Sequence, residues 1–331
     1  IPLASRNIAN NYLMLSQLFA TQPDLAITAV AFLLSLLAIT VGYILLSWRG
    51  QWAGLPKIGS RIEFLWVLTT VFWVSMLLNP KLLILYIAFI AFLAFKEFLS
   101  LTPTRRADRR VLFCAYWVIP IQFFCIWRGW REAFNLFTPV VVFLVLPMIM
   151  VIVGETRGFL RAWSTLGWGI ITTVFTLGYL AYLVVLPLPA SSSITGSGLF
   201  LFLVGLAQLN HAAQYYFGKR FTDPRLSLKV STTRNWASLA GSLVVTAPVA
   251  MLIGPRLLHF STPVNLMLGM LISVGGFIGY IIISAIKGDL QLKDRGSMTP
   301  GSGGVLNRID AFVYTAPLYF YIVSYLIQRQ P

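Results

Sequence analysis

The sequence predicts an all-α integral membrane protein with about ten transmembrane helices. Hydrophobic residues make up 58% and charged residues only 11% of the 331 residues, and the mean hydropathy is +0.80, which excludes a soluble globular protein. The apolar residues form repeated runs of roughly 15–25, the length that a helix needs to cross a bilayer. A β-barrel would instead alternate polar and apolar residues in segments of about ten.

Each predicted span is an apolar run bounded by charged residues or by proline and glycine. The second and third runs are short and flank the break Asn79-Pro80-Lys81, which predicts a tight helical hairpin that does not fully span on both legs. No soluble domain interrupts the series, so one compact membrane domain is expected. In chain order, the predicted helices cover residues 25–48, 64–79, 82–95, 111–127, 134–153, 165–187, 198–217, 238–255, 264–286 and 309–327.

The basic residues predict the orientation of these spans. If the N-terminus is outside, 19 of the 25 lysines and arginines fall on the inner side. This split predicts that both termini lie outside and that the polar chemistry faces the cytoplasm. The net charge of +15 is then a feature of topology, and nucleic acid is not expected as a partner. The outer segments hold Arg6, Lys81, Arg128, Arg131, Arg256 and Arg329.

Two features are assigned no chemistry. Residues 1–20 are moderately amphipathic and are expected to lie in the membrane interface. Cys114 and Cys125 fall in or at the end of one apolar run, so packing is expected rather than a disulfide framework or a thiolate zinc site.

The first polar segment runs from the end of the 198–217 helix to residue 238. Helical spacing predicts that Gln208, His211, Gln214 and Tyr215 share one face, with Asn210 beside them. Basic and hydroxyl side chains follow, a composition that suits phosphate oxygens. A positive-inside loop after a polar helix end would have the same composition. These side chains are Lys219, Arg220, Arg225, Lys229 and Arg234 with Ser231, Thr232 and Thr233.

The second polar segment, residues 284–310, surrounds the glycine-rich turn Pro300-Gly301-Ser302-Gly303-Gly304. Its mixed charges stand directly before an apolar helix and suggest a polar cavity, and glycines let backbone N–H groups approach an anion. A solvated loop with a glycine turn is the simpler interpretation. Neither a P-loop nor a dinucleotide fingerprint is present. The charged members are Lys287, Asp289, Lys293, Asp294, Arg295, Arg308 and Asp310.

These two segments resemble the phosphatidate cytidylyltransferases (CDP-diacylglycerol synthases), and most closely a divergent bacterial branch of that family. The family's C-terminal signature is matched by eleven residues in register. The upstream segment is matched at Asn210, Gln214, Tyr215, Gly218 and Lys219 and again at Lys229, Val230 and Ser231. The resemblance covers residues 61–331 and leaves 1–60, an interfacial segment and the first helix, outside it. The signature residues are Ser284, Lys287, Lys293, Asp294, Gly296, Pro300, Gly301, Gly303, Gly304, Arg308 and Asp310.

The resemblance implies a bundle like that of the CDP-diacylglycerol synthases in the bacterial inner membrane, and transfer of a cytidylyl group from CTP to phosphatidate. It implies catalytic roles for Lys287, Lys293, Asp294, Arg308 and Asp310. It implies Mg²⁺ at carboxylates, here Asp294 and Asp310. It also implies a homodimer or a protein partner in the membrane. The implied phosphate-binding residues are Asn210, Gln214, Lys219, Lys229, Ser231, Arg234, Gly303 and Gly304.

The departures from the family pattern fall on its acidic and metal-binding positions. The family's Glu and Asp in the polar helix are Gln208 and His211 here, and its Asp after Gly279 is Tyr280. Its signature histidine is Ser302, and the first Asp of its D-R-x-D is Asn307. A phenol is a poor ligand for Mg²⁺, so a two-metal site is not expected and Mg²⁺ itself is doubtful.

Three hypotheses for the function follow. The first is a pseudoenzyme that keeps a basic pocket for a lipid phosphate, such as that of phosphatidate, and acts as a binding or partner subunit. The second is an active cytidylyltransferase of phospholipid biosynthesis, with a site rebuilt around Asp289, Asp294, Asp310 and His211 or with an altered lipid or nucleotide substrate. The third is a transporter in which Gln208, His211 and Gln214 line a passage.

Overall fold

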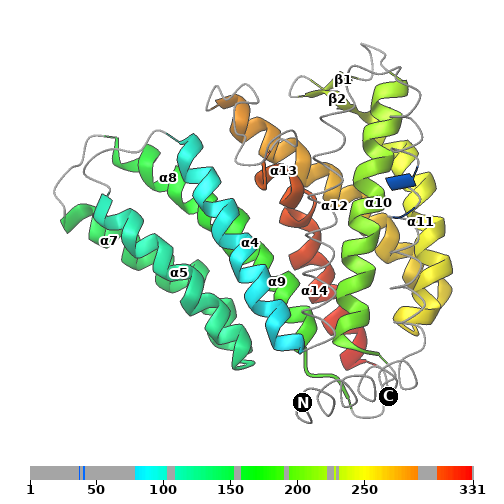
Figure 1. Ribbon diagram of the computed structural model, residues 1–331, viewed down its shortest axis with the longest axis horizontal. Coiled ribbons are helices and arrows are strands. Elements are labelled where there is room, and N and C mark those ends of the chain that lie inside the picture. The colour runs from blue at the N-terminus through cyan, green and yellow to red at the C-terminus, as the bar shows by residue number, and fades with distance from the viewer. Residues whose placement is uncertain are drawn as a thin grey trace, which may run out of the picture. The chain divides into compact units, whose positions relative to one another are not determined.

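The computed structural model describes residues 37, 40–41, 79–102, 109–152, 158–189, 194–221, 227–228, 231–289 and 304–329. The chain divides into two compact units, and the second, Pro80–Thr299 with Gly303–Pro331, contains every helix described below. Figure 1 shows these helices as long rods. The predicted spans 25–48 and 64–79, their hairpin and the interfacial segment 1–20 fall outside the described residues or on isolated positions among them.

The described residues hold eight helices that are long and apolar enough to cross a membrane. They correspond in order to the last eight predicted spans and confirm an all-α membrane protein, with eight spans described where ten were predicted for the whole chain. In chain order they are α4 (Pro80–Leu101), α5 (Arg109–Trp127), α6–η2–α7 (Arg131–Leu136, Phe137–Val142, Phe143–Ile152), α8–η3–α9–η4 (Phe159–Ile170, Ile171–Phe175, Thr176–Tyr182, Leu183–Val185), α10 (Gly196–Arg220), α11 (Trp236–Leu257), α12 (Thr262–Asp289) and α13–α14 (Leu306–Ile309, Phe312–Gln328).

Two predicted boundaries differ from the structure by more than a few residues: α8 begins at Phe159 rather than at 165, and α4 ends later than predicted. The sequence predicts a short helix over 82–95 that ends at the charged pair Lys96-Glu97, whereas α4 continues to Leu101. The helix continues because Glu97 is buried and makes hydrogen bonds inside the bundle, so its charge does not mark a loop. With 22 residues, α4 is long enough to span the bilayer completely.

The helices pack in two groups that α14 joins. In one group α10, α11 and α12 pack against one another, and in the other α4 packs against α5, α8 and α9. α14 contacts both α12 and α9, and Figure 1 places it between the two groups. Aromatic side chains fill the interior around α9 and α14, among them the fully buried Phe134, Tyr182, Tyr319 and Phe320.

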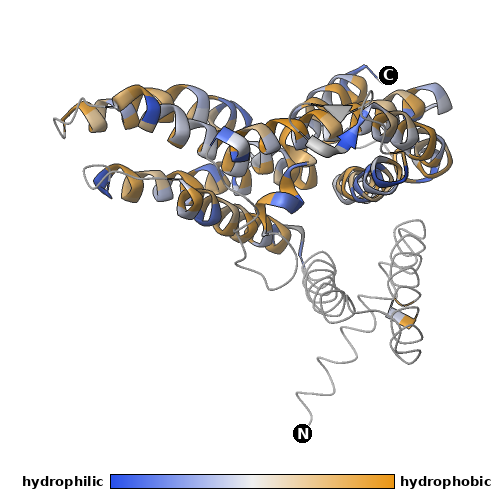
Figure 2. Ribbon diagram, turned by 90° about the horizontal axis from the view of Figure 1, so that it is seen from above, coloured by the Kyte–Doolittle hydropathy of each residue, from blue (hydrophilic) through white to orange (hydrophobic). Residues whose placement is uncertain are grey.

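Large apolar side chains also cover the outside of the bundle. Phe89 on α4, Trp117 on α5 and Leu144 on α7 are all more than half exposed, and Figure 2 shows orange residues along most of each helix. Such a surface is unfavourable in water and fits contact with lipid chains. Both cysteines are free thiols on α5, and Cys125 is buried.

The described residues contain one small sheet, an antiparallel pair between α10 and α11. β1 (Ser227–Leu228) pairs with β2 (Ser231–Asn235), with Ser227 opposite Asn235 and Leu228 opposite Ser231. The predicted basic loop after α10 therefore returns as a hairpin to the start of α11. This return brings β2 against α10 and α12.

Candidate functional site

The buried polar face of α10 is built by Asn210 and Gln214. Both side chains are almost completely buried, and the Gln214 amide donates to Asn210 Oδ1 and to the Ser273 carbonyl, both at 3.2 Å. Asn210 donates to the Ile272 carbonyl at 3.4 Å. These bonds join α10 to α12, so both predicted phosphate-binding side chains pair with protein groups and hold the bundle together.

The remaining predicted members of that face are not buried with them. Gln208 and Tyr215 are exposed, and His211 lies at the edge. The interior side of α10 is set by Asn210 and Gln214, one helical turn apart, and Gln208 and Tyr215 point more than a quarter of a turn away from them. The polar face is therefore narrower than the sequence predicts, because intramembrane polar groups turn toward their partners.

Arg234 reaches the interior because the next residue caps α11. The Asn235 side chain accepts the Ser238 N–H at 2.9 Å, and the Ser238 hydroxyl accepts the Asn235 N–H at 3.1 Å, which makes a reciprocal capping box. The Asn235 amide also donates to the Phe221 carbonyl at 2.7 Å, past the end of α10. Asn235 and Ser238 thus fix the end of β2 and with it the backbone of Arg234.

The Arg234 guanidinium is the centre of the polar cluster. Its side chain is 2% exposed and donates to Gln214 Oε1 and, at 3.3 Å, to His211 Nδ1. It also lies 4.4 Å from the centre of the Tyr280 ring. Burial lowers the pKa of Arg234, while the nearby Asp310 carboxylate and Tyr280 act in the opposite direction. An arginine remains charged even so, so the site contains a permanent buried cation.

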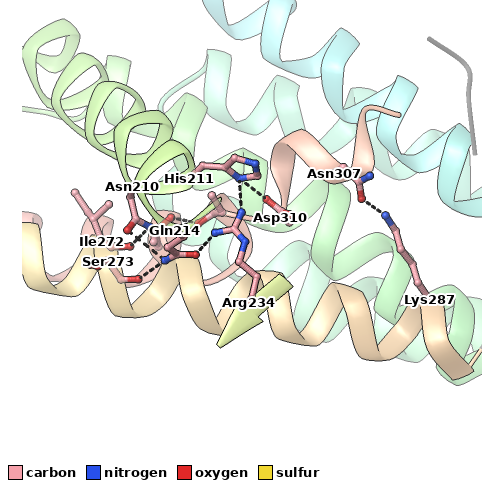
Figure 3. Close-up of polar contacts among 11 residues, drawn as sticks. Asn210, His211, Gln214, Arg234, Ile272, Ser273, Lys287, Asn307 and Asp310 are labelled. Carbon is pink, nitrogen blue, oxygen red and sulfur yellow. Dashed lines mark hydrogen bonds and ion pairs between the residues drawn. The ribbon is translucent and has the colours of Figure 1, made fainter. Parts of the chain in front are cut away.

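Asp310 is the buried carboxylate of the cluster. It is 1% exposed, accepts the Ala311 N–H, and its Oδ1 lies 3.7 Å from His211 Nδ1 without a hydrogen bond. Figure 3 shows the His211 ring in contact with both Arg234 and Asp310. Because Arg234 can only donate, His211 Nδ1 accepts and its proton is on Nε2. A neutral His211 therefore lies beside Asp310, and Arg234 is the nearby cation.

Gly279 lets the polypeptide carrying Asp310 approach α12. A Cβ at Gly279 would meet the Asp310 carbonyl oxygen, so only glycine allows this backbone contact. The next residue on α12, Tyr280, turns toward Arg234. Gly279, which the family pattern indicated, therefore has a packing role. Its neighbour Tyr280 packs against the Arg234 guanidinium.

A second group of charges surrounds the segment before Asp310. The Lys287 ammonium donates to Asn307 Oδ1, and the buried Glu97 accepts the backbone N–H groups of Val305 and Leu306. Sequence reasoning missed Glu97 and assigned it to a loop. The available signal was that the apolar run continues after it, because a charge inside such a run is usually functional and buried in the bundle.

The structure brings together only part of the predicted site. Lys229, Lys293, Asp294, Ser302 and Gly303 lie outside the described residues, and Ser231 is described only as part of the β2 backbone. Lys219, in the last turn of α10, and Asp289, at the end of α12, are exposed. The residues that meet at one end of the bundle are His211, Arg234, Tyr280, Lys287, Gly304, Asn307, Arg308 and Asp310.

Comparison with known proteins identifies the family. The sequence model of the cytidylyltransferase family matches residues 59–326. The chain belongs to the cytidylyltransferase family. The uncharacterized protein YnbB of Escherichia coli is 37% identical over 300 residues, which are 90% of this chain and 97% of that protein.

Shorter matches connect the chain to members of this family with a named activity. The phosphatidate cytidylyltransferase of Synechocystis sp. is 43% identical over 61 residues, 18% of this chain and 21% of that enzyme. The phosphatidate cytidylyltransferase of Brucella suis biovar 1 is 31% identical over 128 residues, 36% of this chain and 44% of that enzyme. The chain thus spans less than half the length of these two enzymes.

Three departures from the family pattern contact basic side chains. His211 accepts from Arg234, Tyr280 lies beneath the Arg234 guanidinium, and Asn307 accepts from Lys287. At each position the resemblance implies a carboxylate in the cytidylyltransferases. At these three positions, where the resemblance implies negative charge, neutral side chains contact the cations Arg234 and Lys287.

The described residues do not fit a Mg²⁺ ion. Among them no three His, Cys, Asp or Glu side chains gather as a group of metal ligands. Mg²⁺ takes oxygen ligands and repels nearby cations, whereas Asp310 faces the Arg234 guanidinium and the two Glu97 hydrogen bonds go to backbone N–H groups. The other predicted ligand, Asp294, lies outside the described residues.

Proposed function

We propose that this member of the cytidylyltransferase family is a pseudoenzyme that binds the phosphate of a membrane lipid. The observation that carries the proposal is the buried Arg234, which contacts His211 and Tyr280 and lies near Asp310. A protein cation takes over the charge balance that divalent metal would supply to an acidic site. Cytidylyl transfer needs such metal to offset charge on the phosphates, so we expect binding without turnover.

The charges that remain suit an anion. Lys287 and Arg308 are partly exposed at the same end of the bundle as Arg234, and the buried carboxylates among the described residues are Glu97 and Asp310. Lysine and arginine donate charge-assisted hydrogen bonds to phosphate oxygens. Phosphatidate carries such a phosphate at the membrane surface, and the phosphates of CTP offer the same groups.

The proposal includes the location of the site. The distribution of basic residues favours the cytoplasmic side of a bacterial inner membrane, with both termini outside. A chain that keeps the bundle and loses the reaction persists most simply as a subunit. A second copy or another membrane protein is therefore proposed as its partner.

One specific observation favours an active enzyme as the second candidate. Asp310 Oδ1 has no hydrogen-bond partner and lies beside His211, whose side chain is 38% exposed. A buried carboxylate oxygen without a partner is unusual and is commonly part of chemistry. In that case the protein would convert CTP and phosphatidate, and Asp310→Asn would abolish the conversion.

The first test measures turnover. Purified protein in phosphatidate-containing micelles is incubated with CTP and either Mg²⁺ or Mn²⁺, beside a variant with His211→Asp, Tyr280→Asp, Ser302→His and Asn307→Asp. We expect no pyrophosphate from the parent. The pseudoenzyme assignment would be overturned if the parent turned over CTP and Asp310→Asn removed that activity. Activity that appears only in the fourfold variant would support the assignment.

The second test measures binding. Phosphatidate should raise the thermal midpoint of the parent more than phosphatidylcholine does, because a ligand of the native state stabilises it. Lys287→Gln with Arg308→Gln should lose most of this difference. Arg256→Gln is the matched control, since Arg256 is an exposed basic residue in the last turn of α11. Equal shifts with both lipids would contradict phosphate recognition.

A further inference from the structure

Glu97 is a buried carboxylate in a membrane-spanning helix, far in sequence from the signature that it contacts. It is 1% exposed near the end of α4, and its Oε2 accepts the N–H of Val305 at 2.6 Å and of Leu306 at 3.3 Å. The Val305 contact joins residues 208 positions apart. Burying a charged carboxylate among apolar side chains costs free energy unless it has hydrogen-bond partners. A carboxylate that is kept inside a membrane-spanning helix is therefore expected to have a function.

Gly304, the last residue of the glycine-rich turn, leaves room for this carboxylate. Gly304 has a φ of +80°, and a Cβ added there would overlap Glu97 Oε1. Only glycine adopts that backbone conformation without strain, and only glycine leaves room for the carboxylate. The last glycine of the turn thus contacts Glu97 rather than solvent.

The contact is made at the start of a continuous helical rod. Asp310 and Ala311, between α13 and α14, keep helical dihedral angles, and a single span runs from Leu306 to Gln328. A carboxylate at the first N–H groups of a helix satisfies donors that have no partner within the helix and opposes the positive end of its dipole. Glu97 therefore holds the end of the rod that carries Arg308 and Asp310.

The geometry also links Glu97 to the cations of the site. Lys287 acts electrostatically on Glu97 and donates to Asn307, which lies on the same rod. At 1.5 Å per residue, Val305 lies only about 7.5 Å along the rod from Asp310. A movement of the rod at Glu97 would shift Arg308 and Asp310 together relative to Arg234 on β2.

We infer that Glu97 is a positioning residue that clamps the backbone of residues 304–306 to α4 and so sets the place of Arg308 and Asp310 in the anion site. The inference rests on the proposed function for the identity of the ligand. The inference goes beyond the proposed function because it assigns a role in the site to a residue outside both polar segments. It also makes α4 one of the helices that position the site. Glu97 itself does not contact the ligand.

The test combines local hydrogen exchange with lipid binding. Glu97→Ala should accelerate exchange in a peptide covering residues 304–310 by about tenfold or more, because two bonds to a charged acceptor are lost, with little change in α10 or α11. Its affinity for phosphatidate in micelles should fall by about tenfold. Glu97→Gln keeps an acceptor oxygen and should recover part of both effects. Glu132→Gln is the control, since Glu132 is exposed in the first turn of α6.

Each outcome separates the two proposals. The clamp would be overturned if Glu97→Ala left hydrogen exchange at residues 304–310 unchanged. It would also be overturned if exchange accelerated equally in all helices, because that result shows only general destabilisation. Local acceleration with normal phosphatidate affinity would also overturn it, because the clamp would not serve the site. If the parent binds no phosphatidate, the proposed function fails, and the local loss of protection still supports the clamp. Gly304→Ala should cause the same loss of exchange protection at residues 304–310, because its Cβ would displace the Glu97 carboxylate.

Discussion

Removal of the Arg234 cation is the strongest perturbation of the site that the structure offers. Arg234→Met keeps most of the side-chain length but leaves Gln214 Oε1 without its donor and Asp310 without its neighbouring cation. A buried acceptor without a partner costs about 1–3 kcal/mol, and breaking a buried charge pair from one side costs about 3–5 kcal/mol. Because methionine recovers part of the packing against Tyr280, we expect a loss of about 3 kcal/mol in the free energy of unfolding.

The assay is a double-mutant cycle with Asp310→Asn, measured by SDS-induced unfolding in micelles. Replacing both charges leaves no unpaired ion, so Asp310→Asn should cost less in the Arg234→Met background than in the parent, with a coupling of about 1–3 kcal/mol. Arg220→Met, an exposed arginine in the last turn of α10, should change stability by about 0.5 kcal/mol or less. If Arg234→Met behaves like this control, or if the two substitutions are additive, the charge balance argued for the site is wrong.

Two further predictions concern the backbone supports of the site. Asn235→Ala should lower stability by about 1 kcal/mol or more in the same unfolding assay, because it removes the cap of α11. Asn235→Asp keeps the acceptor for Ser238 but loses the amide that donates to Phe221, so it should recover only part of this loss, and equal losses would contradict the capping role. Gly279→Ala should lower the free energy of unfolding by about 1–3 kcal/mol, because the added Cβ overlaps the Asp310 carbonyl oxygen. Gly205→Ala is the control and should be neutral or stabilising, since a Cβ there meets no atom within 4 Å. A neutral Gly279→Ala would contradict the close contact by showing that α12 can move to accept the methyl group.

The fold class could be predicted from the sequence because its determinants are local. Run length and hydropathy alone placed eight helices that the structure confirms, each to within a few residues except at the start of α8 and the end of α4. At α4 the local rule failed, since Lys96-Glu97 has the composition of a helix end. Whether a charge ends a span depends on whether another part of the chain supplies its partners, and Val305 and Leu306 are more than 200 positions away.

The candidate site was predicted in composition but not in arrangement. The motif spacing indicated Lys287, Arg308 and Asp310 together with the neutral replacements His211 and Tyr280. It did not indicate that His211 and Tyr280 both face Arg234, nor that Asn210 and Gln214 hold α10 to α12 rather than face outward. Helical periodicity states which residues share a face. It does not state which face turns inward, because that depends on the neighbouring helices.

The sequence by itself determined that this is a helical membrane protein of the cytidylyltransferase family. Only the tertiary structure decided which neutral side chains engage Arg234 and Lys287, and that the Glu97 carboxylate on α4 holds the backbone of Val305 and Leu306. The physical reason is the cost of burial. A charge in the bundle interior is stable only beside its partner, and that partner is chosen by packing between distant segments.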